Sequence, residues 1–426
     1  MGLRERYHDI RYGFEANFWV ANTLELFERL AFYGATAVLV VFIAEKVGLK
    51  DEASTLAGIF SGLIFFLPVL AGVFVDRYGF KKSLTACFAI FALGYFLIGL
   101  AGMDAGKGIV AAIGPKAYVI AVLIITAIGG SLIKPCIVGT VDRTTKPETK
   151  SLGFAIYYTL VNFGGAIGPM LALPVRQTFG IEFVLIVSSV TSLLLLIGTR
   201  LFFREPPTPS GGTSTRTFGK VFRDMLMVFT NFRFISFLII FSGFWIMFWQ
   251  IFFLLPLYTL DVLHYEHFEI LETIDAWAII LLTVPVTVLT RKFKPIVSIT
   301  GGLILASISW VVVGAGGTVA FTVVGIAIYA LGESLQSPRF YEYVASIAPP
   351  EQTGTFMGFA FLPVAIGAFA GGIFADFLRT TYMSTNPRLM WFLVAGVGAV
   401  AVTLMILYNM FLAPRRPVEV VQPEKP

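Results

Sequence analysis

Three charged residues lie within five positions near the start of the chain, in a stretch that is otherwise apolar. Glu25, Glu28 and Arg29 belong to the run Glu25-Leu-Phe-Glu28-Arg29-Leu-Ala-Phe-Tyr33-Gly34. A charge at the centre of a membrane-spanning helix costs roughly 2.5 to 3.5 kcal/mol on insertion scales, and such residues usually serve a function. Because residues three and four apart are neighbours on a helix, the three side chains share one face.

Two further charges, Lys134 and Glu333, lie in apolar stretches far along the chain. With a rise of about 1.5 Å per residue, Lys134 reaches the depth of Glu25 and Glu28, and Glu333 lies near the middle of its span. A buried ion pair that only fixes helix packing is the simpler explanation for any one of these residues. Since desolvation largely offsets the attraction within such a pair, five charges at matching depth favour a functional role.

The chemistry open to these groups is proton exchange and the capture of an anion. Burial favours the neutral form of a carboxyl group, whereas a neighbouring cation favours its charged form. A carboxylate that exchanges a cationic partner for a proton can couple transport to a proton gradient. A lysine and an arginine that face a cavity can hold an anionic group of a solute.

The composition places these residues in a membrane protein. The 426 residues are 57% hydrophobic and 13% charged, whereas soluble domains carry about 25% charged residues. The basic residues behind the net charge of +5 are spread over short loops, which suits an anionic membrane surface and not nucleic acid. Cys87 and Cys136 lie in apolar stretches, so neither a disulfide framework nor a cysteine metal site is expected. The polar start, Met1 to Gly13, predicts no cleavable signal peptide.

Twelve stretches are long and apolar enough to cross a bilayer, which takes about 20 residues. They span residues 17–43, 54–75, 83–102, 118–140, 153–175, 182–202, 234–260, 273–290, 296–314, 319–347, 355–376 and 390–412. An even number places both termini on one side. Twenty-two Lys and Arg residues fall on that side and seven on the other, so both termini are predicted to be cytoplasmic.

A Pro-, Gly- and Ser-rich segment after Arg204 predicts a flexible linker between spans six and seven. We therefore expect an N-terminal six-helix bundle (1–203), a linker and lead-in (204–233), a C-terminal six-helix bundle (234–412) and a tail (413–426). Two such halves with a site between them are typical of the major facilitator superfamily. The loop Gly72-Val-Phe-Val-Asp76-Arg77-Tyr-Gly79-Phe-Lys81-Lys82 resembles a signature of that superfamily. The resemblance implies a gating role for Asp76 and Arg77.

A narrower resemblance rests on four motifs. Glu25-x-x-Glu28-Arg29-x-x-x-Tyr33-Gly34 resembles a motif of the proton-dependent oligopeptide transporter family. So do Gly130-Ser-Leu-Ile133-Lys134-Pro135-Cys136, Gly332-Glu333-x-x-x-Ser337-Pro338 and Met357-Gly-Phe-Ala-Phe361-Leu362-x-x-Ala365-Ile366-Gly367. The resemblance implies that Arg29 and Lys134 hold a peptide carboxylate and Glu333 the amino group. It also implies that Glu25 and Glu28 take part in proton coupling with Lys134, and we expect Glu333 to take part as well. The remaining residues expected at the substrate are Tyr33, Tyr158, Asn162, Trp245 and Gln250.

The chain departs from this family on its C-terminal side. The acidic residue expected around Phe248 or Trp249 is absent, and Ala360 and Ala368 stand in place of a tryptophan and an asparagine. Asp275 stands where an asparagine-proline pair is expected, and we interpret it as a charge at the membrane interface. These changes affect the pocket on its amino-group side.

Together these features predict an all-α major facilitator fold with twelve transmembrane helices in the cell membrane. The expected function is proton-coupled import of short peptides or similar small zwitterionic or anionic solutes. Transport of a non-peptide organic solute, or a receptor or scaffold without transport, are the alternatives. We expect no enzyme activity, no cofactor beyond the proton gradient, no metal and a monomer. Spans lack His-Glu-x-x-His and Gly-x-Ser-x-Gly motifs, and there is no Walker-type loop for ATP.

Overall fold

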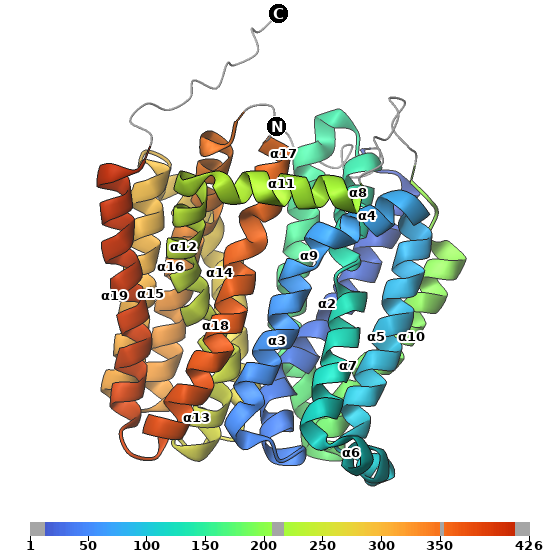
Figure 1. Cartoon of the computed structure of the whole chain (residues 1–426), viewed down its shortest axis with the longest axis vertical. Coiled ribbons are helices and arrows are strands. Elements are labelled where there is room, and N and C mark those ends of the chain that lie inside the picture. Colours follow the sequence, from blue (N-terminus) through green and yellow to red (C-terminus); the bar gives the residue numbers. More distant parts are fainter. Residues whose placement is uncertain (1–12, 207–216, 350–352, 414–426) are drawn as a thin grey trace, which may run out of the picture.

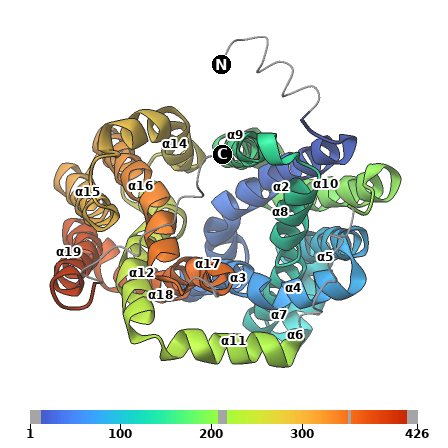
Figure 2. The same cartoon turned by 90° about the horizontal axis from the view of Figure 1, so that it is seen from above.

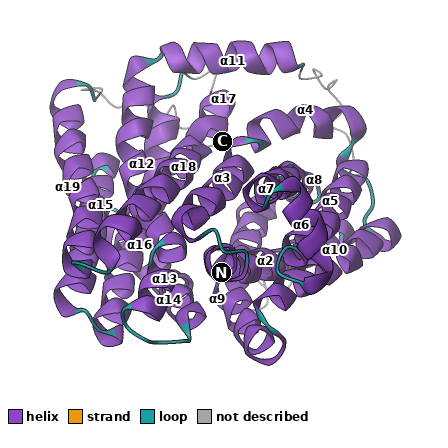
Figure 3. Ribbon diagram, turned by 60° about the horizontal axis from the view of Figure 1, so that its bottom comes forward, coloured by secondary structure: helices purple, strands orange, loops and turns teal. Residues whose placement is uncertain are grey.

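The structure, a computed structural model, describes residues 13–206, 217–349 and 353–413. Within these ranges the chain is helical and forms no strand, only an isolated bridge between Phe14 and Thr145 (Figure 3). Most of the polar N-terminal stretch, the Pro- and Gly-rich part of the linker and nearly all of the tail lie outside the described residues. So do seven of the basic residues that predicted the orientation: Arg4, Arg6, Arg11, Arg216, Arg415, Arg416 and Lys425.

The N-terminal half is built from α2 to α10. The helices are α2 (Ala16–Val41, continued by a π-helix, Phe42–Lys46), α3 (Ala53–Phe66), α4 (Pro68–Tyr78), α5 (Phe80–Leu100), α6 (Lys107–Ile113), α7 (Pro115–Gly130), α8 (Ile133–Arg143), α9 (Lys150–Phe179) and α10 (Ile181–Phe202). Single 3-10 turns occupy Lys50–Glu52, Asp104–Gly106 and Pro147–Thr149.

The C-terminal half is built from α12 to α19. The helices are α12 (Phe232–Phe253), α13 (Leu255–Asp261), α14 (Phe268–Thr290), α15 (Pro295–Gly316), α16 (Val319–Ile347), α17 (Thr353–Gly358), α18 (Leu362–Leu378) and α19 (Pro387–Phe411). A 3-10 turn, Phe359–Phe361, joins α17 to α18, and a π-helix, Arg379–Met383, follows α18.

The predicted twelve spans are confirmed by length and composition. Eleven described helical segments are long and apolar enough to cross a membrane, and α3 with α4 makes the twelfth, bent by 48°. The bend falls at Leu67 and Pro68, because proline lacks a backbone N–H and fixes the start of a new helix. The eighth span begins at Phe268, five residues before its predicted start, since the prediction excluded the acidic residues Glu269 and Glu272.

The predicted lead-in to the seventh span contains a helix, α11 (Phe218–Thr230), that lies across the ends of the other helices (Figure 1). Val221 and Val228 are buried, whereas Phe222, Leu226 and Phe229 are exposed. A helix with one apolar face outward suits the plane of a membrane interface. We call the surface that carries α11 the α11 face and the opposite surface, with α6 and α13, the α6 face.

Seen along the spans, the helices form two groups joined along one side by α11 (Figure 2). The start of α2 lies beside the end of α10, because the side chain of Asn17 pairs with the backbone of Arg204 through two hydrogen bonds of 2.8 and 2.9 Å. The halves meet mainly through α3 against α18 and α9 against α14. These two seams frame the space in which the site lies.

Candidate functional site

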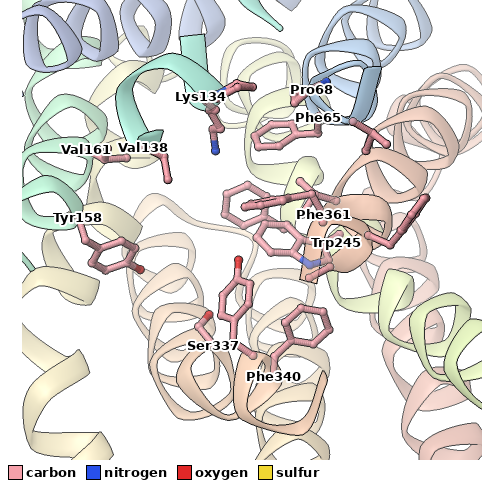
Figure 4. Close-up of a pocket in the computed structure, with 18 of the residues that line it drawn as sticks. Phe65, Pro68, Lys134, Val138, Tyr158, Val161, Trp245, Ser337, Phe340 and Phe361 are labelled. Atoms are coloured by element: carbon pink, nitrogen blue, oxygen red, sulfur yellow. The ribbon is translucent and has the colours of Figure 1, made fainter. Parts of the chain in front are cut away.

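A cavity of about 800 Å³ lies between the two halves. Side chains of both halves line it (Figure 4). Of the 31 described residues in the lining, fifteen are aromatic. Among the described residues, the charged ones in the lining are Lys134, Asp224 and Glu333. A large apolar cavity with a few separated polar groups is typical of a site for an organic ligand.

Lys134 supplies the positive charge of the cavity. It lies in the first turn of α8, just after the break between α7 and α8 at Ser131 and Leu132. Its Nζ atom lies 4.9 Å from the ring centroid of Phe65 and 5.1 Å from that of Phe361, one ring from each half. Among the described residues no carboxylate lies within 4.0 Å of Nζ. Aromatic faces stabilise a cation without neutralising it, so Lys134 remains available to an anion.

Glu333, on α16, contributes an acidic side chain to the lining from the C-terminal half. Lys134 and Glu333 therefore belong to different halves and line the same cavity. Tyr33, Tyr158 and Asn162, which are predicted substrate residues, also line it. The amide of Asn162 donates to the Tyr158 carbonyl at 2.8 Å, and Tyr158 points inward (Figure 4).

The two candidates on α12 have different positions. Trp245 lines the cavity, whereas Gln250 is fully buried outside its lining. The Gln250 amide donates to the carbonyls of Ile246 at 2.8 Å and Gly371 at 3.2 Å. Gln250 thus joins α12 to α18, a contact that sequence spacing alone does not reveal.

The charge cluster of α2 lies behind the cavity wall. Arg29 forms ion pairs with Glu28 and, at 3.5 Å, with Glu25, and all three residues are at most 2% exposed. None of the three lines the cavity. Two cavity residues contact the cluster: the Tyr157 hydroxyl lies 3.4 Å from Glu25, and the Phe32 ring lies 4.7 Å from the Arg29 guanidinium. Arg29 is predicted to contact the substrate, but in this structure two carboxylates hold it behind the side chains that line the cavity.

Hydrogen bonds between the halves close the α6 face. The Asp376 carboxylate of α18 accepts bonds from the backbone amides of Ser54 at 3.0 Å and Thr55 at 2.7 Å, in the first turn of α3. A carboxylate in this position satisfies free amides and interacts favourably with the helix dipole. Close packing adds to this contact, since a Cβ atom on Gly372 would lie only 2.4 Å from the Ser54 carbonyl oxygen.

Ion pairs cross the same face. Arg176 of α9 pairs with Glu269 of α14 and donates to the Glu266 carbonyl at 2.6 Å. Arg379 pairs with Asp51 at 2.7 Å. At the other end of the cavity, residues of α11 belong to the lining. The cavity therefore extends toward the α11 face and is closed at the α6 face.

Asp76 and Arg77, the candidate gating residues, are exposed at the end of α4. The Arg77 guanidinium lies 5.5 Å from the neighbouring Tyr78 ring. Among the described residues neither side chain forms an ion pair. The gating role that the resemblance implies for them therefore stays a prediction.

The interpretation of Asp275 as an interfacial charge is wrong. Asp275 is 7% exposed, and its Oδ1 atom is buried with no hydrogen-bond partner among the described residues. Glu272, one turn earlier, is 2% exposed, and neither of its carboxylate oxygens has a partner. The pattern Glu269-x-x-Glu272-x-x-Asp275 was the signal that could have revealed this buried acidic face.

Comparisons with known proteins identify the group to which these features belong. The model of the Major Facilitator Superfamily matches residues 24–372. Multidrug resistance protein MdtH of Photorhabdus laumondii is 24% identical over 390 residues, 90% of this chain and 91% of that protein. Peptide transporter YePEPT of Yersinia enterocolitica is 28% identical over 165 residues, 37% of this chain and 30% of that protein.

Solved structures agree with this grouping at the level of the fold. A POT family transporter in complex with 5-aminolevulinic acid superposes with a TM-score of 0.76 at 16% identity, covering 94% of this chain and 96% of that one. A peptide transporter POT in complex with sulfate gives a TM-score of 0.75 at 17% identity, covering 94% of each chain.

Proposed function

The chain belongs to the major facilitator superfamily, a family of membrane transporters, and from this premise we propose that it moves an organic solute in exchange or in symport with protons. The proposed solute has an aromatic body and carries a negatively charged group together with a positively charged one. The observation that carries this proposal is the single cavity in which Lys134 and Glu333 face the same space from different halves.

The lining supports an aromatic solute. Lys134 lies between Phe65 and Phe361, and Trp245, Phe248 and other rings continue the wall. Rings favour stacked or edge-on contacts with other rings, worth about 0.5 to 1.5 kcal/mol beyond the area that they bury. The MdtH relatives, which match nearly the whole chain, are named for multidrug resistance. A broad, ring-lined cavity suits such solutes.

The charges at the cavity support recognition of both ends of the solute. A carboxylate can pair with the Lys134 ammonium, and an amine can pair with the Glu333 carboxylate. Because the two groups belong to opposite halves, a bound zwitterion bridges them. This bridge is the differential contact that a ligand needs to favour one conformation over another.

A short peptide, the solute first expected from the sequence, is the second candidate. The opposite charges of Lys134 and Glu333 suit its two ends, and the POT family structures share the fold. Against it stand the ring of Phe248 in place of an acid and the position of Arg29 behind the wall. We therefore rank the aromatic non-peptide solute first.

Proton coupling is proposed for the carboxylates beside the cavity, Glu25, Glu28 and Glu333. Glu25 and Glu28 share the single guanidinium of Arg29. These three residues together therefore carry one net negative charge when all of them are ionised. Each carboxylate also has one buried oxygen without a partner among the described residues: Oε2 of Glu25, Oε1 of Glu28 and Oε2 of Glu333. Uptake of a proton relieves this uncompensated buried charge, which is the role of such groups in transporters.

Transport in proteoliposomes tests the proposal. The probes are rhodamine B, an aromatic zwitterion, its ethyl ester, which lacks the carboxylate, and a labelled Ala-Phe dipeptide. We expect a pH gradient to drive accumulation of rhodamine B in preference to the ester. Accumulation driven by an inward proton gradient indicates symport, and accumulation driven by an outward proton gradient indicates exchange. Preferential uptake of Ala-Phe would select the peptide candidate. Absence of flux for all probes under both gradients would contradict transport and favour a receptor or scaffold.

Lys134→Gln should weaken binding of rhodamine B about tenfold or more, because a hydrogen bond to a charged group contributes about 1.5 to 3 kcal/mol. Binding of the ester, which has no carboxylate, should change little. Lys116→Gln is the matched control, since Lys116 pairs with Glu52 at 2.7 Å and is exposed outside the cavity. Equal losses for the zwitterion and the ester would refute recognition of the carboxylate by Lys134.

A further inference from the structure

The first two turns of α14 carry three acidic residues at three-residue intervals, Glu269, Glu272 and Asp275. Three residues advance a helix by about 4.5 Å, so the series covers about 9 Å from the α6 face toward the middle of the span. All three are at most 7% exposed. The series does not belong to the charge cluster of α2, which lies in the other half.

Only the first member of the series has a cationic partner. Glu269 pairs with Arg176 across the two halves. Glu272 has both carboxylate oxygens buried without a partner among the described residues, and Asp275 has one such oxygen. An ionised carboxylate without compensation costs several kcal/mol in such a place. The unpartnered carboxyl groups therefore need a cation or a proton.

The series ends next to the cavity. Asp275 lies close enough to Glu333 of the neighbouring helix α16 for their charges to interact, and Glu333 lines the cavity. Among the described residues, the other titratable groups near this end are tyrosines: Tyr329 and Tyr341 of α16, Tyr33 of α2 and Tyr158 of α9. Within the described residues no lysine, arginine or histidine lies within 4.0 Å of Glu272, Asp275 or Glu333. No nearby cation thus neutralises the inner part of the series.

We propose that Glu272 and Asp275 form a proton route in the C-terminal half, leading from the α6 face to Glu333. When the Arg176–Glu269 ion pair breaks, a proton from the solution at the α6 face binds to the Glu272 carboxylate. It then moves to Asp275, which leaves Glu272 ionised again, and from Asp275 to Glu333. The route rests on the proton coupling proposed above and names residues that carry it.

The geometry favours a proton over a bound metal ion. Among the described residues, no group of three or more histidine, cysteine, aspartate or glutamate side chains could hold a metal ion. Carboxylates along a helix can pass a proton from one to the next without meeting at one point. Buried carboxylates inside a membrane are typical of such relays.

The test uses the full-length protein in proteoliposomes with rhodamine B as the probe and trapped pyranine as the reporter of internal pH. Glu272→Gln and Asp275→Asn should lose accumulation driven by a pH gradient and the accompanying proton flux. Glu182→Gln is the control, because Glu182 is also buried near the α6 face but pairs with Lys46 at 2.8 Å in the N-terminal half. The control should keep both signals. Wild-type coupling in Glu272→Gln and Asp275→Asn, or accumulation driven by a sodium gradient alone, would overturn the route.

A second readout needs no solute. Infrared difference spectra across a pH titration report protonation of buried carboxyl groups directly. We expect a carboxyl band in the wild type that Glu272→Gln and Asp275→Asn each reduce and Glu182→Gln keeps. If the wild type moves no probe but shows this pattern, the proposed function fails and protonation of the series stands. If neither variant alters the band, the route is refuted whatever the transport result. If one variant fails to fold, the other variant decides the test.

Discussion

Replacing Asp376 by asparagine should open the α6 face. Asp376 is 5% exposed and accepts two backbone hydrogen bonds from the first turn of α3, in the opposite half. If the proposed transport proceeds by alternating access, the halves must part at this face, so we expect the contact only while the face is closed. Asparagine keeps the size of the side chain but loses its charge, and it offers one acceptor oxygen in place of two.

The expected magnitude follows from the role of Asp376 as a cap of α3. A hydrogen bond to a charged group contributes about 1.5 to 3 kcal/mol and one between neutral groups about 0.5 to 1.5 kcal/mol, so exchanging the carboxylate for an amide should cost about 1 to 2 kcal/mol. A change of 1 or 2 kcal/mol alters the ratio of two states by a factor of about 5 to 30. The ratio of open to closed molecules should rise by this factor.

Double electron–electron resonance measures that ratio. Spin labels on Ala111→Cys and Thr385→Cys report the α6 face, since Ala111 lies in the N-terminal half, Thr385 lies in the C-terminal half and both are exposed. Cys87 and Cys136 are buried and are first replaced by alanine. Asp376→Asn should add a longer distance component to the distribution seen in the parent protein.

Asp51→Asn is the matched control. Asp51 pairs with Arg379 across the same face, but its side chain is 83% exposed, and an exposed ion pair contributes about 0 to 1 kcal/mol. It should shift the distribution less than Asp376→Asn does. If both variants shift the distance distribution equally, the buried Asp376 bonds stabilise the closed face no more than the exposed ion pair does. If Asp376→Asn leaves it unchanged, the reasoning is refuted.

Two further variants address coupling and packing. Glu28→Gln should abolish concentrative uptake of rhodamine B while solute exchange continues, because exchange needs no net proton transfer; concentrative uptake by this variant would remove Glu28 from the coupling scheme. Gly372→Ala should open the α6 face, since its Cβ atom would lie 2.4 Å from the Ser54 carbonyl oxygen and overpacking costs about 1 to 3 kcal/mol. Gly108→Ala, where a Cβ atom meets nothing within 4 Å, should leave the same distance distribution unchanged.

The spans could be predicted from the sequence because hydropathy is a local property. Each stretch of about 20 apolar residues is identified without knowledge of its neighbours. The same local reasoning found Lys134 and Glu333, since a charge in an apolar run stands out wherever the helix packs. It failed at the eighth span, where Glu269 and Glu272 lowered the apolar content and moved the predicted start inward by five residues.

The contacts of each charge were decided by the tertiary structure. The sequence placed Glu25, Glu28 and Arg29 on one face of a helix, but the rotation of that helix turned the cluster behind the cavity wall. Gln250 likewise became a link between α12 and α18. The bond between Asp376 and the first turn of α3 joins residues more than 300 positions apart, so no local pattern can predict it.

The sequence by itself therefore determined that this chain crosses the membrane twelve times and keeps charges inside its spans. Both facts depend on the cost of moving single groups from water into an apolar medium. Only the tertiary structure decided that Lys134 and Glu333 share one cavity, that Arg29 is held by two carboxylates, and that Asp275 is buried on a helix packed against the helix of Glu333. These depend on helix rotation and bending, which are set by packing between segments that are distant in the chain.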